Sequence, residues 1–132
     1  MFLLDTNIFL ELFLEQEKAD EVEHFLRVRP KQEFHISESS VYSLGVILFR
    51  RNQAAMFIQF TDDVIVNGGI RLLRLLTQDM RKVAATAQRF RLDFDDAYQY
   101  VVAETHGLQI VSFDSDFERT EKGRKTPANV GD

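Results

Sequence analysis

Apolar residues along this 132-residue chain fall into two patterns, short unbroken runs and longer stretches with three- and four-residue spacing. Short runs predict buried strands, and spaced stretches predict amphipathic helices. The runs predict strands at Phe2–Leu4, Phe34–Ile36, Ile70–Leu75 and Gln109–Ser112. The spaced stretches predict helices over Ile8–Glu15, Lys18–Val28, Glu38–Arg51, Met80–Phe90 and a segment from about Ala97 that ends at Gly107.

The stretch between Gln53 and Val66 fits two interpretations. Val64-Ile65-Val66 taken alone is typical of a strand. Ala54, Phe57, Ile58 and Ile65 also form a helical stripe, and Asn67-Gly68-Gly69 is a good helix terminator. We therefore expect a helix here.

Short buried strands that alternate with helices predict an α/β fold, a three-layer α/β/α sandwich with a central, mostly parallel sheet. We expect one domain over residues 1–132. The polar tail from about residue 119, with the basic Lys122-Gly123-Arg124-Lys125, is expected to lie at the surface or to be frayed. Binding sites of such sheets form beyond the carboxyl ends of the strands.

Composition removes several classes of function. With 45% hydrophobic residues the chain can form a core, and with no cysteine it has no disulfides, thiolate nucleophile or cysteine-based metal site. Its net charge of −5 argues against general electrostatic binding of nucleic acid, but permits a nuclease whose acids hold a divalent cation. No apolar stretch is long enough to span a membrane and the N-terminus is not a secretory signal, so we expect a cytoplasmic protein.

Acidic residues stand where the predicted elements meet. Asp5 follows the first strand, Asp114 and Asp116 follow the last, and Asp96 begins a helix. If the first and last strands are neighbours, these carboxylates converge at one edge of the sheet. Clustered carboxylates raise one another's pKa, and a hard divalent cation such as Mg²⁺ or Mn²⁺ relieves that repulsion.

Each acid also has an ordinary structural interpretation. Asp5 and Asn7 could cap a helix, and Asp96 could favour a helix N-terminus by its charge alone. Asp114 and Asp116 could be turn residues. The joint pattern is more informative than any single acid.

Three motifs in this order resemble the PIN domain family, and more narrowly its VapC-type toxins. The strand ending in Leu4-Asp5-Thr6-Asn7 resembles the first family motif, and Leu92–Tyr98 resembles the third, with Asp96 at the invariant acid. Val111–Phe117 is similar to the closing motif, and the likeness covers nearly the whole chain. The resemblance implies Mg²⁺ or Mn²⁺ dependence, a single-stranded RNA substrate, an antitoxin protein as partner and a homodimer.

We therefore expect a metal-dependent endoribonuclease, the toxin of a toxin–antitoxin pair. Asp5, Asp96 and Asp114 are the expected catalytic and metal-binding residues, and Asp116 would hold the metal directly or through water. Thr6, Asn7 and Ser112 would orient these carboxylates by hydrogen bonds.

One departure from the family pattern leaves an alternative open. Members usually have a glutamate in the helix after the second strand, and here that slot falls on Ser43. The nearest acid, Glu38, is five residues earlier, which is about 140° around a helix and ~7.5 Å along it. Either Glu38 reaches the metal, or the site has one acid fewer. The alternative function is a catalytically weak PIN-fold module that binds RNA or a partner protein without cleavage. A phosphatase or receiver-like domain is a third possibility, but it needs a lysine at a late strand end that we do not find before the tail.

Overall fold

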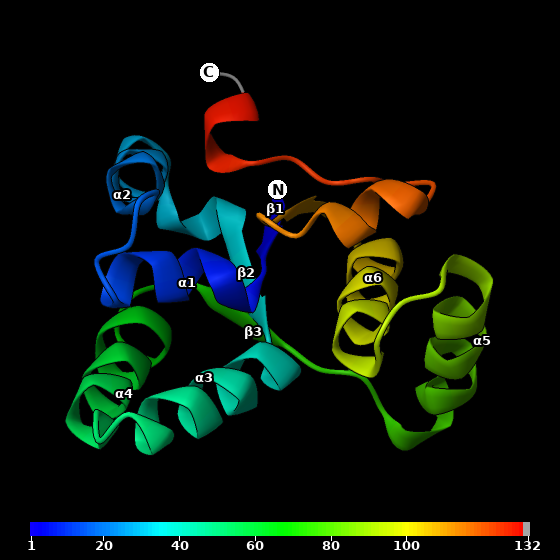
Figure 1. Ribbon diagram of the computed structural model, residues 1–132, viewed down its shortest axis with the longest axis horizontal. Helices are drawn as coiled ribbons and strands as arrows, with labels where there is room; N and C mark the ends of the chain where they lie inside the picture. Colours follow the sequence, from blue (N-terminus) through cyan, green and yellow to red (C-terminus); the bar gives the residue numbers. More distant parts are fainter. Residues whose placement is uncertain (131–132) are drawn as a thin grey trace.

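The computed structural model describes residues 1–130 and contains a parallel sheet between two layers of helices (Figure 1). Its strands are β1 (Phe2–Leu4), β2 (Phe34–Ser37), β3 (Arg71–Leu73) and β4 (Gln109–Val111). Their spatial order is β3-β2-β1-β4, and every pair is parallel. Leu4 lies opposite Val111, so the first and last strands are neighbours whose carboxyl ends meet.

The helices of the described chain divide between the two faces of the sheet. They are α1 (Thr6–Phe13), α2 (Ala19–Val28), α3 (Glu38–Arg50), α4 (Ala54–Phe60), α5 (Met80–Phe90) and α6 (Phe94–His106). The first four lie on one side of the sheet, and α5 and α6 lie on the other (Figure 1). The predicted three-layer α/β/α sandwich is confirmed.

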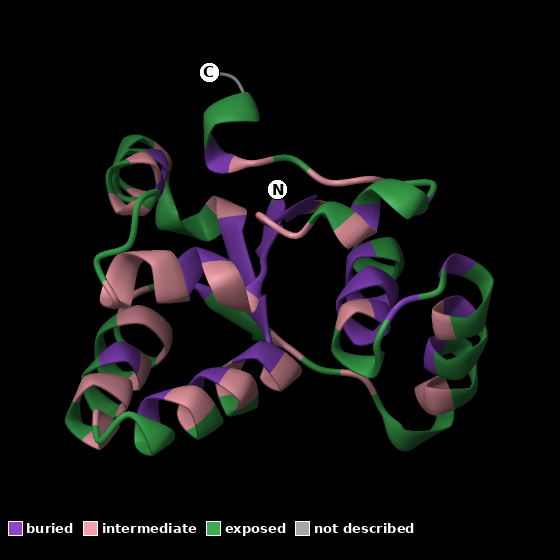
Figure 2. Ribbon diagram, in the orientation of Figure 1, coloured by how far each residue is buried: buried purple, intermediate pink, exposed green. Residues whose placement is uncertain are grey.

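Each layer of helices buries its own group of apolar side chains against the sheet. Ile8, Phe9 and Leu44 belong to the core on the α1–α4 side, while Val83 and Val101 belong to the core under α5 and α6. Figure 2 shows β1, β2 and the inner helix faces as buried, whereas the edge strand β3 is mostly exposed. The hydrophobic spacing thus predicted the faces that pack, and this packing fixes the carboxyl edge of the sheet in position.

The ambiguous stretch is helical, as expected, and the strand alternative is wrong. α4 continues directly into a π-helical segment over Thr61–Val66. The Asn67 N–H donates to the Asp62 carbonyl at 2.9 Å, five residues back, which is the π-helical pattern.

The tail lies at the surface but is not frayed as far as residue 130. A 3₁₀ turn spans Ser115–Arg119, and beyond it Lys125 pairs with the edge of β4. The Lys125 N–H donates to Ile110 and its carbonyl accepts from the Ser112 N–H, both at 2.9 Å. Backbone groups form these bonds whatever the polarity of the side chains, so the tail adds to the sheet edge. Residues 131 and 132 of the expected tail lie outside the described residues.

Within residues 1–130, no helix combines the length and apolar content that a membrane span requires.

Candidate metal centre

Three of the predicted acids line one cavity at the carboxyl edge of the sheet. Asp5 directly follows β1, Asp114 follows β4, and Asp96 lies in the first turn of α6. The cavity has a volume of about 720 Å³ and opens between α3 and α6. The parallel register explains this convergence, because it brings the ends of β1 and β4 side by side.

Asp5 is the most deeply buried of these acids and the one with most hydrogen-bond donors. It is the N-cap of α1, where its Oδ1 accepts from the Thr6 N–H at 2.8 Å. Its Oδ1 also accepts from Gln99 Nε2 at 3.1 Å, and its Oδ2 accepts from Ser112 Oγ at 2.6 Å. Burial raises the pKa of Asp5, while the hydrogen bonds from Ser112, Gln99 and Thr6 oppose that rise. Asp5 therefore serves both as the N-cap of α1 and as one of the acids of the cavity.

The residues expected to orient the acids do so in different ways. Asn7 Nδ2 lies 3.4 Å from Asp5 Oδ2 and 3.2 Å from Ser112 Oγ, so it contacts both partners. Ser112 Oγ also accepts from the Asp114 N–H at 2.9 Å. Thr6 contacts Asp5 through its backbone, whereas its hydroxyl donates to Ser40 Oγ at 3.0 Å.

Asp96, Asp114 and Asp116 form the tightest group of carboxylates. One oxygen from each lies within 4.8 Å of the others, a spacing that one cation could bridge. The pKa of Asp96 rises to about 7 because of burial, then the charges of Asp114 and Asp5, and then a hydrogen bond shared with Asp114. Two neighbouring carboxylates therefore add to the cost of burying the Asp96 charge.

Asp116 is tied back by an arginine that the sequence analysis did not single out. Arg119 Nη1 donates to Asp116 Oδ1 at 2.9 Å, and Arg119 Nε donates to the Phe90 carbonyl at 3.0 Å. The same guanidinium also donates to the Arg91 carbonyl. Arg119 therefore joins the C-terminal end of α5 to one carboxylate oxygen of Asp116.

Neither α3 residue discussed above supplies a carboxylate to the tight group. Ser43 lines the cavity, so its position faces the acids but presents a hydroxyl. Glu38 also borders the cavity, and its Oε2 lies 3.8 Å from Arg74 Nε. In the described chain, the group of three acids within 4.8 Å does not include Glu38.

Gln99 and Ser40 complete a buried polar network that the sequence analysis missed. Gln99 on α6 and Ser40 on α3 are both buried, and Gln99 Nε2 donates to Ser40 Oγ at 2.6 Å as well as to Asp5. A possible signal was that Gln99 stands in a helix that is otherwise apolar on all sides from Ala97 to Ala103. A buried glutamine costs free energy unless its amide has partners, so it points to a polar neighbour.

The donor set fits a hard divalent cation. Its oxygens come from carboxylates, which Mg²⁺ and Mn²⁺ prefer. Burial, followed by the charges of Asp114 and Asp5, raises the pKa of Asp96 to about 7, and a cation would offset both causes. Asp96, Asp114 and Asp116 would provide the nearest oxygens, whereas Asp5 lines the same cavity but is not part of this group.

Solved structures with the same fold come from several organisms. A toxin–antitoxin complex from Klebsiella pneumoniae has a TM-score of 0.75 at 22% identity, covering 96% of this chain and 98% of that chain. The toxin VapC20 of Mycobacterium tuberculosis, described as cleaving the sarcin–ricin loop, has a TM-score of 0.77 at 16% identity, with coverages of 89% and 93%. FitAcB from Neisseria gonorrhoeae has a TM-score of 0.71 at 18% identity, with coverages of 98% and 100%.

No curated protein matches the sequence. The family model described as PIN domain matches residues 2–123, almost the full chain. The order of the elements, the parallel sheet and the acids at its carboxyl edge agree with that match. This chain belongs to the PIN domain family.

Proposed function

We propose that this protein is a divalent-cation-dependent endoribonuclease that cleaves single-stranded RNA, and that it is the toxin of a toxin–antitoxin pair. The observation that supports this most directly is the convergence of Asp5, Asp96 and Asp114 on one cavity, with the pKa of Asp96 raised to about 7. The similar structures described as toxins support the biological role, with an antitoxin protein as the expected partner. A cytoplasmic location and a homodimer are part of the same proposal.

The chain's residues divide the work of the site between them. Asp96 and Asp114 would hold Mg²⁺ or Mn²⁺ with Asp5, and Asp116 would contact it directly or through water. Such a cation, when bound, would acidify a water molecule and offset negative charge on the phosphodiester. Ser112 and Gln99 keep the Asp5 carboxylate in one orientation, because each donates to a different oxygen. Ser112 Oγ also accepts from the Asp114 N–H, so this one hydroxyl links the segment after β4 to Asp5 at the end of β1.

Cleavage of an end-labelled single-stranded RNA in Mn²⁺ tests this function. We expect the wild-type protein to cut the RNA, and Asp5→Asn to reduce the rate by at least about a hundredfold because a ligand charge and its geometry are lost together. Asp95→Asn is the matched control, since Asp95 also lies on the cavity wall but is exposed, whereas Asp5 is buried among hydrogen-bond donors. Equal rates for wild type and Asp5→Asn would refute the proposal.

The serine at position 43 favours one competing function, a PIN module that binds RNA or a partner protein without cutting. Ser43 provides no charge where the family usually has a glutamate. Titration of Mn²⁺ by calorimetry separates the two functions, because saturable binding with a matching rise in melting temperature would argue against the non-catalytic module.

A further inference from the structure

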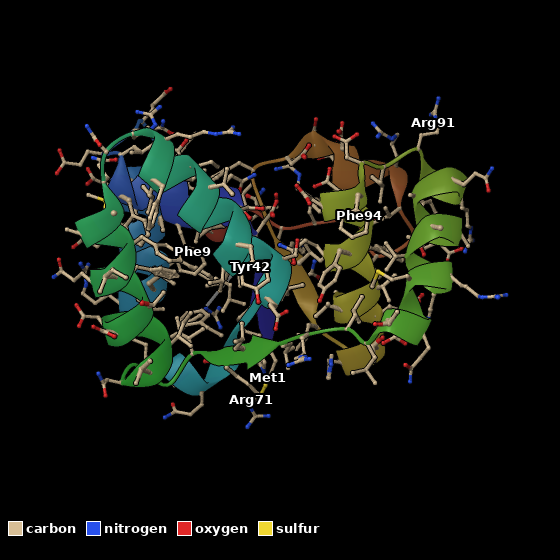
Figure 3. The ribbon with its side chains drawn as sticks, turned by 90° about the horizontal axis from the view of Figure 1, so that it is seen from below. Met1, Phe9, Tyr42, Arg71, Arg91 and Phe94 are labelled. Atoms are coloured by element: carbon tan, nitrogen blue, oxygen red, sulfur yellow. The ribbon has the colours of Figure 1, made fainter. Side chains whose placement is uncertain are left out.

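Two aromatic side chains stand exposed on the cavity that contains the acids. Tyr42 on α3 is 64% exposed and Phe94 at the start of α6 is 58% exposed. Both line the cavity together with Asp5, Asp96 and Asp114. Figure 3 shows the two rings on the two helices that border this opening. Single exposed apolar residues are common, but two aromatic rings over one acidic site form a local feature.

Each ring is anchored at one edge, which leaves a face open. The Phe94 ring contacts the ring of Tyr98, with centroids 6.1 Å apart and an interplanar angle of 55°. Tyr98 is buried, and its hydroxyl accepts from the Leu75 N–H at 2.8 Å. On the other side of the cavity, the Tyr42 hydroxyl is held by a hydrogen bond to Glu38. The charge of Glu38 and this hydrogen bond raise the pKa of Tyr42. The rings therefore lose little freedom if a flat ligand stacks on them.

The cavity offers different chemistry at its two ends. Acids occupy the sheet edge, whereas Val46 and Ile47 extend the apolar wall beside Tyr42. Arg74, whose side chain is 68% exposed, lies 3.8 Å from Glu38, which lines the cavity, and brings a positive charge next to it. A nucleotide has the matching division, with an anionic phosphate and a flat apolar base. A volume of about 720 Å³ lies within the ordinary range for small-ligand pockets.

We propose that Tyr42 and Phe94 stack on unpaired bases that flank the phosphate held at the acids, so that the site selects single-stranded over double-stranded nucleic acid. The proposal rests on the proposed nuclease function and deepens it. Every base presents a flat face, but in a duplex both faces are already covered by neighbouring pairs. The same two residues would therefore favour single strands without strong sequence preference.

A binding assay without metal tests this separately from cleavage. The probe is a single-stranded RNA octamer with 2-aminopurine at its centre, titrated with protein in EDTA at low salt. We expect fluorescence quenching with the wild type, because 2-aminopurine loses emission when it stacks. Stacking contributes about 1–3 kcal/mol per base, so Tyr42→Leu and Phe94→Leu should each weaken binding by about 5- to 150-fold and reduce the quenching. Leucine keeps apolar bulk but removes the flat ring.

Matched variants separate stacking from general apolar contact. Phe49→Leu is the control, because Phe49 lies on the same helix as Tyr42, is 57% exposed and does not line the cavity. Tyr42→Phe and Phe94→Trp should keep wild-type affinity, since both retain an aromatic face. The leucine variants should bind single-stranded DNA of the same sequence more weakly than the wild type does, by the same factor as for RNA. An RNA duplex should bind the wild type and the leucine variants equally weakly.

Two results would overturn the proposal. One is wild-type affinity and quenching in both leucine variants, which would mean that the rings serve another purpose such as contact with a partner protein. The other is the absence of any quenching by the wild type. Cleavage in Mn²⁺ together with unchanged leucine variants would leave the nuclease function intact and remove only the stacking. Loss of quenching in the leucine variants together with full activity of Asp5→Asn would support the stacking and refute the proposed nuclease function.

Discussion

Replacing Asp96 by asparagine should stabilise the metal-free protein even though it removes a proposed metal ligand. Burial and the charges of Asp114 and Asp5 raise the pKa of Asp96 from 3.8 to about 7. A shift of that size corresponds to an upper bound of about 4 kcal/mol at neutral pH. Asp96 is only partly buried, so solvent screening reduces the penalty to about 1–2 kcal/mol. The first turn of α6 favours the negative charge by about 0.3–1 kcal/mol, which leaves a net gain near 1 kcal/mol for Asp96→Asn.

Thermal unfolding in EDTA at pH 8 measures this gain. For a domain of this size, about 1 kcal/mol corresponds to a rise of roughly 3–5 °C in melting temperature. Asp95→Asn is the matched control, since Asp95 is the preceding, exposed residue of the same helix turn. Its melting temperature should stay the same or fall slightly, because it loses only the favourable interaction with the helix N-terminus.

The pH dependence gives the sign of the effect independently. Below about pH 4, Asp96 is protonated in both the folded and the unfolded state and contributes nothing. Between about pH 4 and pH 7 the folded state keeps a proton that the unfolded state releases, so the wild-type free energy of unfolding falls as pH rises. Above about pH 7 Asp96 is ionised in both states, and the free energy of unfolding falls no further on its account. Asp96→Asn should lack this part of the decline, and a variant no more stable than wild type in EDTA at pH 8 would refute the reasoning.

Three further perturbations test the same network. Gln99→Leu removes a buried donor to Asp5 and should weaken Mn²⁺ binding by about 10- to 100-fold in calorimetry. The melting temperature of the metal-free protein should change only slightly. Ser43→Glu places a carboxylate on the cavity wall and should tighten Mn²⁺ binding while lowering the metal-free melting temperature, whereas Ser43→Gln should do neither. The wild-type Kd for Mn²⁺ should fall about tenfold per pH unit below the Asp96 pKa of about 7 and level off above it, because binding displaces one proton.

The fold could be predicted from the sequence because its pattern is regular. Short apolar runs and helical spacing give the strands and helices in the right order, and the alternation of the two implies parallel strands. Their bounds differ in places, since the strand predicted at Ile70–Leu75 is only Arg71–Leu73. Once β1 and β4 are neighbours, Asp5 and Asp114 must meet at the carboxyl edge. The family motifs point to the same residues, so two separate arguments reach one cavity.

The contacts that tune the acids could not be predicted in this way. Gln99 is 94 positions from Asp5, and its role depends on which way a buried side chain points from α6. Arg119 contacts Asp116 and the carbonyl groups at the end of α5, and sequence spacing does not reveal the second contact. The pairing of Lys125 with β4 depends on backbone groups, so the polar composition of the tail concealed it.

The difference between Asp5 and Asp96 shows why acids of one type take different roles. Asp5 is more deeply buried, yet neutral donors from Thr6, Gln99 and Ser112 approach both of its oxygens and stabilise the charged form. Asp96 instead shares a hydrogen bond with another acid, Asp114, and faces the charge of Asp5 as well. Burial raises the pKa of both acids, and at Asp96 the charges of two neighbouring carboxylates add to that rise, which a divalent cation would offset. The repulsion at Asp96 makes it a position where neutralisation should raise the stability of the metal-free protein and lower its metal affinity together.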